Sequence, residues 1–323
     1  MTPDLFDNTP DAYDPLDAID AMLDSVIPER DAGRLLLDIA DVRRAALCLR
    51  GDRLEKNMAG LGSLWGYFPH ALNVKVSGVS IADKLADPKA RASVVRKAWA
   101  FIQKYEGGRV SYNRVRQSVK AYCGHHVSNF RPVAARDIYA ALGGSGAVFD
   151  PCAGWGGRLV GAIGAGCTRY LGLDASQRTV HGLRQIAADA NYGATIRHTA
   201  VEDADVGEEW ADIAFTSPPY FDAERYSDDP EQSWVRYGSY GSWRDGFLVA
   251  LLAQMARAVR IGGVVAVNIA DVRKLPLCAD TVAIAEGMGL KREPDLRYIL
   301  SSIAGKGEKF EPVFLFRKTE RAP

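Results

Sequence analysis

The chain has 323 residues, enough for two ordinary domains or one large one, and 47% of them are hydrophobic and 25% charged. This composition is typical of a soluble globular protein and excludes a disordered or fibrous chain. Forty basic and forty acidic residues balance, so the net charge by itself indicates no partner. The sequence has no run of 18 uncharged apolar residues, its acidic start does not resemble a secretory signal, and its five cysteines form no CxxC pair. We therefore expect a cytoplasmic protein with no contact to membranes, no structural zinc and no disulfide framework.

Charge is distributed unevenly along the chain. Residues 1–42 carry a net charge of −9 and residues 89–131 a net charge of +9. We expect residues 1–16 to be a mobile acidic tail, residues 17–124 to form a mainly helical region that is a candidate for nucleic-acid contact, and residues 125–323 to form a second domain.

The first 130 residues have the apolar spacing of helices. Apolar side chains recur every three or four residues in 17–26, 32–50 and 88–105, which is the period of one helix face. Asp87-Pro88 is typical of a capped helix start with proline in the first turn.

From about residue 145 short β-branched or apolar runs alternate with helical patterns, which predicts a mostly parallel sheet covered by helices. The expected strands are 147–150, 170–174, 195–199, 211–216, 264–270, 296–300 and 313–316, and the expected helices are 158–166, 176–191, 243–260 and 277–288. No helical pattern separates the last two runs, so we expect them to pair as an antiparallel edge hairpin.

A glycine-rich turn follows the first of these strands. The strand ends at Asp150, and Gly154, Gly156 and Gly157 precede a helix that starts near Arg158. Glycines here allow a ligand to approach the backbone and leave amide donors free at the helix start. A turn that only packs a helix on a strand would have the same pattern.

Carboxylates follow the next two strands. Asp174 ends the second strand, where an acid can accept hydrogen bonds from ribose hydroxyls, and Glu202 and Asp203 follow the third. Each acid could instead be a solvated loop residue. Three acids and no lysine in the turn favour a nucleoside that carries a sulfonium over a polyphosphate.

The segment Ser217-Pro218-Pro219-Tyr220 directly follows the fourth strand. Two prolines hold the backbone extended, so that carbonyls can point into a crevice beside a serine hydroxyl and a flat tyrosine ring. This combination suits a planar base with an exocyclic NH2 group. A rigid turn is the simpler alternative.

Together these two motifs resemble the DNA amino-methyltransferases that use S-adenosylmethionine to modify cytosine N4 or adenine N6. The likeness covers roughly residues 125–318 and implies a Rossmann-like class I methyltransferase fold with S-adenosyl-L-methionine as cofactor. It implies that the catalytic residues are Ser217, Pro218, Pro219 and Tyr220. It implies cofactor binding by Asn129, Phe130, Arg131, Asp150, Cys152, Gly154, Gly156, Asp174, Glu202 and Asp203.

The sequence also departs from the family pattern. Cys152 stands where the family usually has phenylalanine, and Trp155 where it has a small residue. Only 60 residues separate the two motifs, so a target-recognising part would have to be the N-terminal region or the 221–242 loop. Serine at the first position of the second motif favours cytosine N4 slightly over adenine N6 by family likeness.

We expect DNA as the partner, contacted by the Lys and Arg residues of 89–131 and by the aromatic 221–242 loop. The loop rings could instead fill a small core, and the cations could form a solvated helix face neutralised by residues 1–42. Other readings are the same fold methylating RNA, a free nucleotide or a protein glutamine, or a nucleic-acid-binding protein with an inactive methyltransferase core. The sequence does not indicate an oligomeric state.

Overall fold

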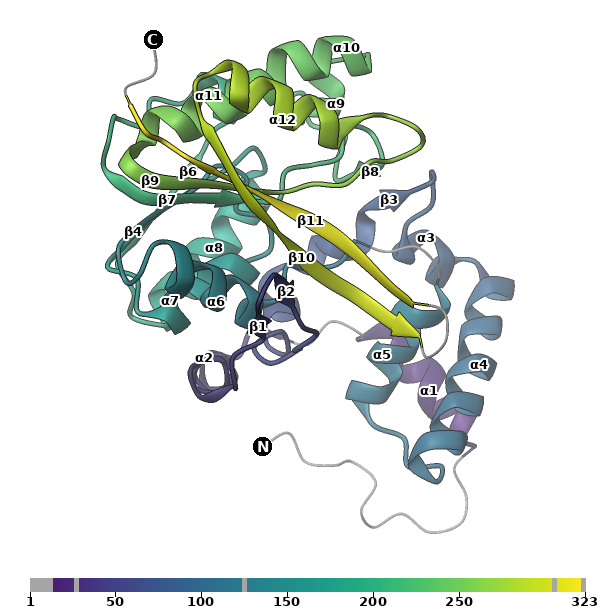
Figure 1. Ribbon diagram of the computed structural model, residues 1–323. Helices are drawn as coiled ribbons and strands as arrows, with labels where there is room; N and C mark the ends of the chain where they lie inside the picture. Colours follow the sequence, from purple (N-terminus) through teal and green to yellow (C-terminus); the bar gives the residue numbers. More distant parts are fainter. Residues whose placement is uncertain (1–13, 26–28, 124–126, 304–306, 321–323) are drawn as a thin grey trace. The chain divides into compact units, whose positions relative to one another are not determined.

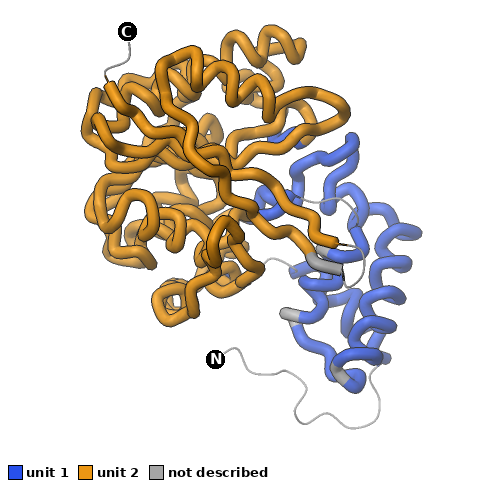
Figure 2. Tube along the Cα trace, in the orientation of Figure 1, with its two compact units in different colours: residues 1–29, 69–128, 224–227 blue, residues 30–68, 129–223, 228–323 orange. Residues whose placement is uncertain are grey.

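The computed structural model describes residues 14–25, 29–123, 127–303 and 307–320. It divides into two compact units (Figure 2), unit 1 with residues 1–29, 69–128 and 224–227 and unit 2 with the rest. The expected tail falls mostly outside the described residues, but Pro15 and Leu16 already belong to a helix. The expected domain boundary at 124/125 also lies outside them. Residues 30–68 group with the sheet in unit 2, and residues 224–227 group with the helices of unit 1.

Unit 1 is a small helical body with its own core. Its elements are α1 (Pro15–Asp24), η2 (Pro69–Asn73), β3 (Lys75–Val76), α3 (Ile81–Ala86), α4 (Pro88–Glu106), α5 (Tyr112–Tyr122) and β8 (Glu224–Arg225). Helix α4 begins as expected, since the Asp87 carboxylate accepts the Ala90 amide at 2.6 Å, and it ends at Gly107 in the left-handed conformation. Ile19, Val94, Ile102 and Val119 are among the side chains that fill the core between α1, α4 and α5.

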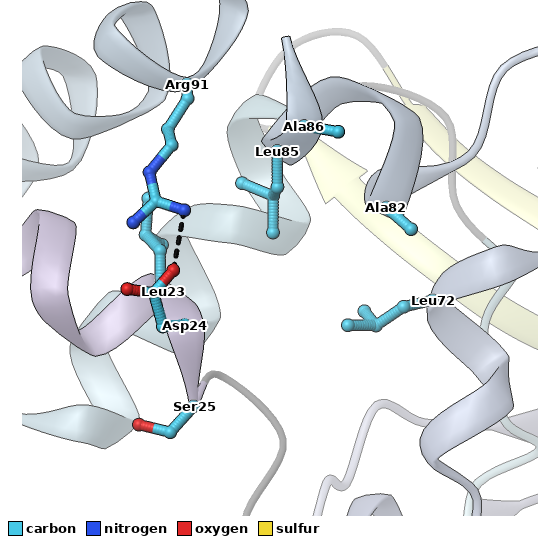
Figure 3. A pocket seen from close by; sticks show the side chains of 8 residues that line it. All are labelled: Leu23, Asp24, Ser25, Leu72, Ala82, Leu85, Ala86 and Arg91. Carbon is cyan, nitrogen blue, oxygen red and sulfur yellow. Dashed lines mark hydrogen bonds and ion pairs between the residues drawn. The ribbon is translucent and has the colours of Figure 1, made fainter. Parts of the chain in front are cut away.

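One arginine joins the acidic helix α1 to the basic helix α4. Arg91 donates to Asp20 at 2.7 Å and to Asp24 at 2.8 Å. Beside this contact lies a pocket of about 380 Å³, drawn in Figure 3 and lined by Leu23, Asp24, Ser25, Leu72, Ala82, Leu85, Ala86 and Arg91. None of the predicted site residues lines it.

Unit 2 begins with a segment that packs against the sheet domain. Its elements are α2 (Ala32–Arg44), β1 (Leu49–Arg50), β2 (Arg53–Leu54) and η1 (Leu64–Tyr67). The helix expected over 32–50 ends at Arg44, because a buried side-chain pair captures the chain there. Arg136 donates to the carbonyls of Val42 and Ala45, and Asp137 accepts the amides of Cys48 and Leu49. The side chains of Arg136 and Asp137 thus bind backbone carbonyls and amides that would form hydrogen bonds within the helix if it continued.

The sheet of unit 2 contains every strand expected from the sequence. The strands are β4 (Ala147–Asp150), β5 (Arg169–Asp174), β6 (Ala194–His198), β7 (Ala211–Thr216), β9 (Val259–Asn268), β10 (Lys291–Ile303) and β11 (Gly307–Arg317). Their order is β10-β11-β9-β7-β4-β5-β6, with β11 antiparallel to both of its neighbours and the pairs from β9 to β6 parallel. This confirms the Rossmann-like class I methyltransferase fold and its terminal hairpin. The sheet has nine strands rather than seven, since β1 and β2 extend it beside β10.

Helices cover both faces of this sheet. α6 (Pro132–Leu142), α7 (Gly157–Ala165) and α8 (Gln177–Asp189) lie on one face, and α10 (Tyr240–Trp243), α11 (Val249–Ala258) and α12 (Leu277–Gly287) on the other (Figure 1). The remaining elements are η3 (Val201–Asp203), α9 (Ser233–Arg236) and the π-helical turn η4 (Arg244–Leu248). The apolar spacing did not predict α5, α6 or the short elements of 224–243. No helix in the described ranges is both long and apolar enough to span a lipid bilayer.

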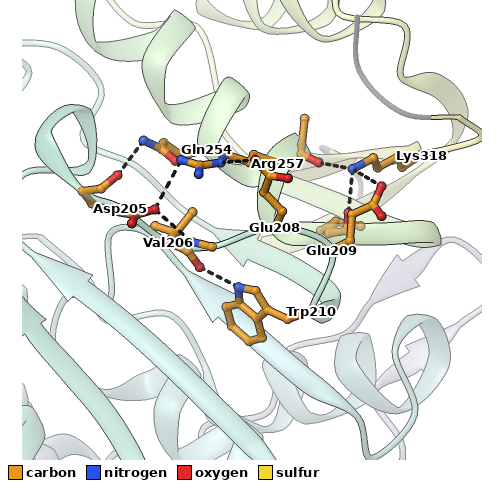
Figure 4. Close-up of polar contacts among 12 residues, drawn as sticks. Asp205, Val206, Glu208, Glu209, Trp210, Gln254, Arg257 and Lys318 are labelled. Carbon is orange, nitrogen blue, oxygen red and sulfur yellow. Dashed lines mark hydrogen bonds and ion pairs between the residues drawn. The ribbon is translucent and has the colours of Figure 1, made fainter.

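The buried Lys318, which directly follows β11, forms hydrogen bonds to the end of α11 and the start of β9. The Lys318 ammonium donates to the carbonyls of Ala256 at 3.0 Å and Val259 at 2.9 Å and lies 3.4 Å from the Glu209 carboxylate (Figure 4). The two carbonyls belong to the C-terminal end of α11 and the start of β9, where helix carbonyls lack partners within the helix.

We predict that Lys318→Met lowers the free energy of unfolding by about 3 kcal/mol, because two buried carbonyls lose their donor. Urea denaturation measures the change. Lys291→Met, on an exposed position of the same hairpin, is the control and should change stability little. Equal stability of Lys318→Met and wild type would contradict the prediction.

Candidate active site

The glycine turn joins β4 to α7, and two of its glycines have positive φ values. Gly154 has φ +57° and Gly156 φ +77°, conformations that favour glycine. A side chain at Gly156 would meet the end of the Ile186 side chain at 2.7 Å, so it would displace that side chain as well as strain the backbone. A side chain at Gly154 would meet no atom closer than 3.8 Å. A side chain at Gly154 would make ordinary van der Waals contacts, so its positive φ rather than crowding favours glycine at this position.

A buried ion pair lies behind the turn. Arg158 donates to both carboxylate oxygens of Asp150, at 2.8 and 3.2 Å, and also to the Cys152 carbonyl. The Tyr170 hydroxyl donates to Asp150 at 2.8 Å. Asp150 is wholly buried and both of its oxygens are occupied, so it shapes the turn from behind. Its direct contact with a cofactor stays a prediction.

Asp174, at the end of β5, holds the front of the turn. Its carboxylate accepts the Gly154 amide at 3.0 Å and the Ser176 amide at 2.9 Å. Burial raises the pKa of Asp174 to about 6, although these two hydrogen bonds favour the ionised form. The structure thus brings Asp174 and Gly154 together, as expected for neighbouring strand ends.

The segment Asn129-Phe130-Arg131 contacts the turn from the other side. The Asn129 amide donates to the Trp155 carbonyl at 2.5 Å and accepts the Gly157 amide at 3.2 Å. The Phe130 ring lies edge-on to Phe215 of β7, and the buried Arg131 guanidinium lies 3.9 Å from the Tyr298 ring centre. The Nε and Nη2 atoms of Arg131 have no hydrogen-bond partner within the described part of the chain.

Ser217, Pro218, Pro219 and Tyr220 follow β7, the strand paired with β4. The Tyr220 hydroxyl donates to Glu311 at 3.1 Å and lies 3.5 Å from the Asn268 carbonyl. Directly afterwards Phe221 has φ +55°, a conformation that is uncommon for a side chain of this size. The chain therefore turns sharply after Tyr220. Because β4 and β7 are parallel neighbours, the two motifs end at the same edge of the sheet.

The acids after β6 are bound by an arginine. Arg236 of α9 lies 2.8 Å from Asp203 and 3.6 Å from Glu202. Burial raises the pKa of Glu202, although the nearby positive charge of Arg236 lowers it. Cys152 is half-buried against the core, and burial raises the pKa of its thiol well above the ordinary value, so the thiol stays protonated.

The rings of the 221–242 loop are largely structural. Phe221, Tyr237 and Tyr240 pack against the core cluster around the buried Trp243. The Tyr240 hydroxyl donates to Asp280 at 2.5 Å. This is the small core that the sequence left open as an alternative.

Two residues that shape the site, Arg158 and Glu311, had no role predicted from the sequence. Arg158 alone had a local signal, since it lies in the first turn of the helix that follows Asp150. Glu311 had no such signal, because nothing near it in the sequence indicates that β11 brings it to Tyr220.

The known proteins that this chain resembles are solved structures of methyltransferases. Neither a scan against protein-family models nor a search of curated proteins gave a match. Among solved structures, a methyltransferase from Pyrococcus furiosus aligns with a TM-score of 0.43 and 14% identity, covering 71% of this chain and 98% of that one. A TehB-like SAM-dependent methyltransferase from Corynebacterium glutamicum gives 0.40 and 16%, covering 68% and 97%. A putative RNA methyltransferase from Pyrococcus horikoshii gives 0.40 and 13%, covering 58% and 83%. The fold assignment accordingly rests on the strand order and register of the sheet itself.

We predict that Asp174 titrates near pH 6 in the folded protein, because burial disfavours its charged form. Carboxyl ¹³C NMR of aspartate-labelled protein should show one midpoint near 6 that is missing in Asp174→Asn. Since folding raises this pKa, wild type loses stability as the pH rises through 6, and the variant lacks that loss. The absence of any aspartate midpoint above 5 would contradict the prediction.

Proposed function

We propose that this protein is a methyltransferase that uses S-adenosylmethionine and acts on an exocyclic amine of a DNA base. The observation that carries the proposal is the placement of two motifs. The glycine turn after β4 and the Ser217–Tyr220 segment after β7 lie at the ends of adjacent parallel strands in a sheet of class I methyltransferase order. Ligands of such sheets bind beyond these strand ends.

The residues at the turn fit the proposed cofactor. Bound S-adenosylmethionine supplies a methyl group that its positive sulfur activates for transfer. Asp174 would accept the ribose hydroxyls, and Glu202 with Asp203 would contact the adenine ring. The turn at Gly154, with Asn129 and Arg131 beside it, would hold the methionine end. The carboxylates of this edge suit a positively charged sulfur better than a polyphosphate.

The second motif fits a flat acceptor that carries an NH2 group. The Ser217 hydroxyl and the Pro218 carbonyl would accept the two amine protons and so free the nitrogen lone pair for attack on the methyl carbon. Tyr220 would stack on the acceptor ring and replace the stacking that a base loses when it leaves a duplex. Serine at the first motif position favours cytosine N4 slightly over adenine N6.

Unit 1 carries a basic surface that fits a phosphate backbone. Lys89, Arg96, Lys97 and Lys104 share one face of α4, opposite the buried Val94 and Ile102. Among the described residues, no ion pair involves Lys89, Arg96 or Lys97. Arg91 is the basic residue of this helix that the acidic α1 neutralises. These exposed cations favour contact with DNA over the alternative that the acidic residues of 1–42 neutralise this helix face.

We predict that the protein transfers a labelled methyl group to DNA and that Tyr220→Ala lowers kcat about 100-fold, because the acceptor loses its stacking surface. The dissociation constant for S-adenosylmethionine, measured by calorimetry, should stay within about threefold. Tyr220→Phe keeps the ring and is the milder control.

Parallel incubations with duplex DNA, single-stranded DNA, RNA, free nucleotides and protein identify the acceptor class, and mass spectrometry of digested DNA identifies the base. Exclusive labelling of RNA, free nucleotides or a protein glutamine would overturn the DNA assignment. Failure of the folded protein to bind S-adenosylmethionine would overturn the proposal as a whole.

We also predict that replacing Arg96 and Lys97 together with glutamine weakens DNA binding and lowers the slope of log K against log salt by about two, roughly one for each phosphate that no longer meets a cation. Fluorescence anisotropy over a salt series measures both quantities. Lys291→Gln, an exposed cation of unit 2, is the control and should leave the slope unchanged. An unchanged slope in the double variant would exclude α4 from the DNA contact.

A further inference from the structure

The Tyr220 ring, on which the acceptor would stack, is held by a hydrogen bond from its hydroxyl group. The Tyr220 hydroxyl donates to the Glu311 carboxylate at 3.1 Å, across 91 residues of sequence. The same hydroxyl also lies 3.5 Å from the backbone carbonyl of Asn268. The sharp turn at Phe221 follows at once, so contacts beyond the local chain determine where this ring lies.

Glu311 is a half-buried carboxylate with no ion pair among the described residues. It stands on β11 directly opposite Tyr298 of β10. Burial raises the pKa of Glu311, while hydrogen bonds from Tyr220 and Asn268 and the positive charges of Lys309 and Arg131 lower it. Burying a carboxylate is unfavourable unless hydrogen bonds compensate it, and here Tyr220 supplies one of them.

The cross-strand neighbour of Glu311 contacts the opposite side of the site. The Tyr298 ring stacks on Phe130 with centroids 4.5 Å apart, and its hydroxyl accepts the Arg131 amide at 3.1 Å. Tyr298 therefore contacts Phe130 and Arg131, and its cross-strand partner Glu311 contacts Tyr220. The first segment belongs to the proposed methionine site and the second to the proposed acceptor site.

We propose that Glu311 is a positioning residue that orients the Tyr220 ring for the acceptor, and that the β10–β11 hairpin keeps this ring aligned with the cofactor side through Tyr298. The inference rests on the proposed function and extends it to a residue outside both motifs. Methyl transfer needs the acceptor nitrogen in line with the methyl group, and a displacement of about 1 Å can reduce the rate as much as 100-fold.

The test compares wild type with Glu311→Ala, Glu311→Gln, Tyr220→Phe and the double variant Tyr220→Phe/Glu311→Ala. Glu311→Ala should lower kcat about tenfold and leave the dissociation constant for S-adenosylmethionine within twofold. Glu311→Gln keeps an oxygen acceptor but lacks the charge, like the protonated carboxyl, and should have a rate between those of Glu311→Ala and wild type at every pH. Glu293→Ala is the matched control, since Glu293 lies on the same hairpin and pairs with Arg317 away from the site.

If Glu311 acts through Tyr220, the double variant is no slower than the slower of the two single variants, whereas independent roles multiply the losses. The pH profile adds a second readout. Wild-type kcat should fall on the acid side as Glu311 becomes protonated, above the ordinary range for glutamate, and Glu311→Gln should lack that limb. Multiplied losses, an unchanged kcat in Glu311→Ala or an identical acid limb in Glu311→Gln would overturn the inference.

A measurement without turnover separates this inference from the proposed function. In glutamate-labelled protein, Tyr220→Phe should raise the carboxyl midpoint of Glu311, because the charged form no longer accepts a hydrogen bond from this ring. An unchanged midpoint overturns the positioning role even in an active enzyme. A shifted midpoint in a protein that methylates none of the acceptors supports the contact and overturns the proposed function.

Discussion

The site depends on the buried pair between Asp150 and Arg158. Removal of either partner from such a pair leaves an uncompensated charge in the interior and costs about 3–5 kcal/mol. Here the pair spans the strand end, the turn and the first turn of α7, and Arg158 also binds the Cys152 carbonyl. The turn is therefore held from behind by Arg158 and from the front by Asp174. Its shape is built into the protein, so a ligand need not organise it.

The terminal hairpin likewise holds Tyr220, the residue proposed to contact the acceptor. β11 runs between β9 and β10 and brings Glu311 to Tyr220, while Tyr298 on β10 meets Phe130. The segment before the first strand of the domain and the motif after the fourth are thereby attached to one pair of strands. A reaction that joins two ligands needs such a common support, since its rate depends on their mutual alignment.

Alternation of strands and helices was enough to predict the sheet, the hairpin and both motif turns, because these follow from local periodicity and turn chemistry. Contacts across long stretches of sequence were not predictable in this way. The helix expected over 32–50 stops at Arg44 because Arg136 and Asp137, far along the sequence, capture its end. Glu311 carries no local signal at all. The aromatic spacing of 221–242 was compatible with a ligand surface or a core, and only packing around Trp243 distinguishes the two for most of the rings.

The carboxylates at the strand ends differ in whether a cation already neutralises them. Asp150 is neutralised by Arg158 and Asp203 by Arg236, whereas Asp174 has no Lys, Arg or His within 4 Å in the described ranges and is held by backbone amides. Burial without a cation is the reason its pKa lies near 6. Hydroxyl donors of a bound ribose would stabilise the charged form, and a positively charged sulfur in the same crevice would do so further. This carboxylate, which no cation neutralises, is therefore compatible with the hydroxyl donors and the positive charge of the proposed sulfonium nucleoside.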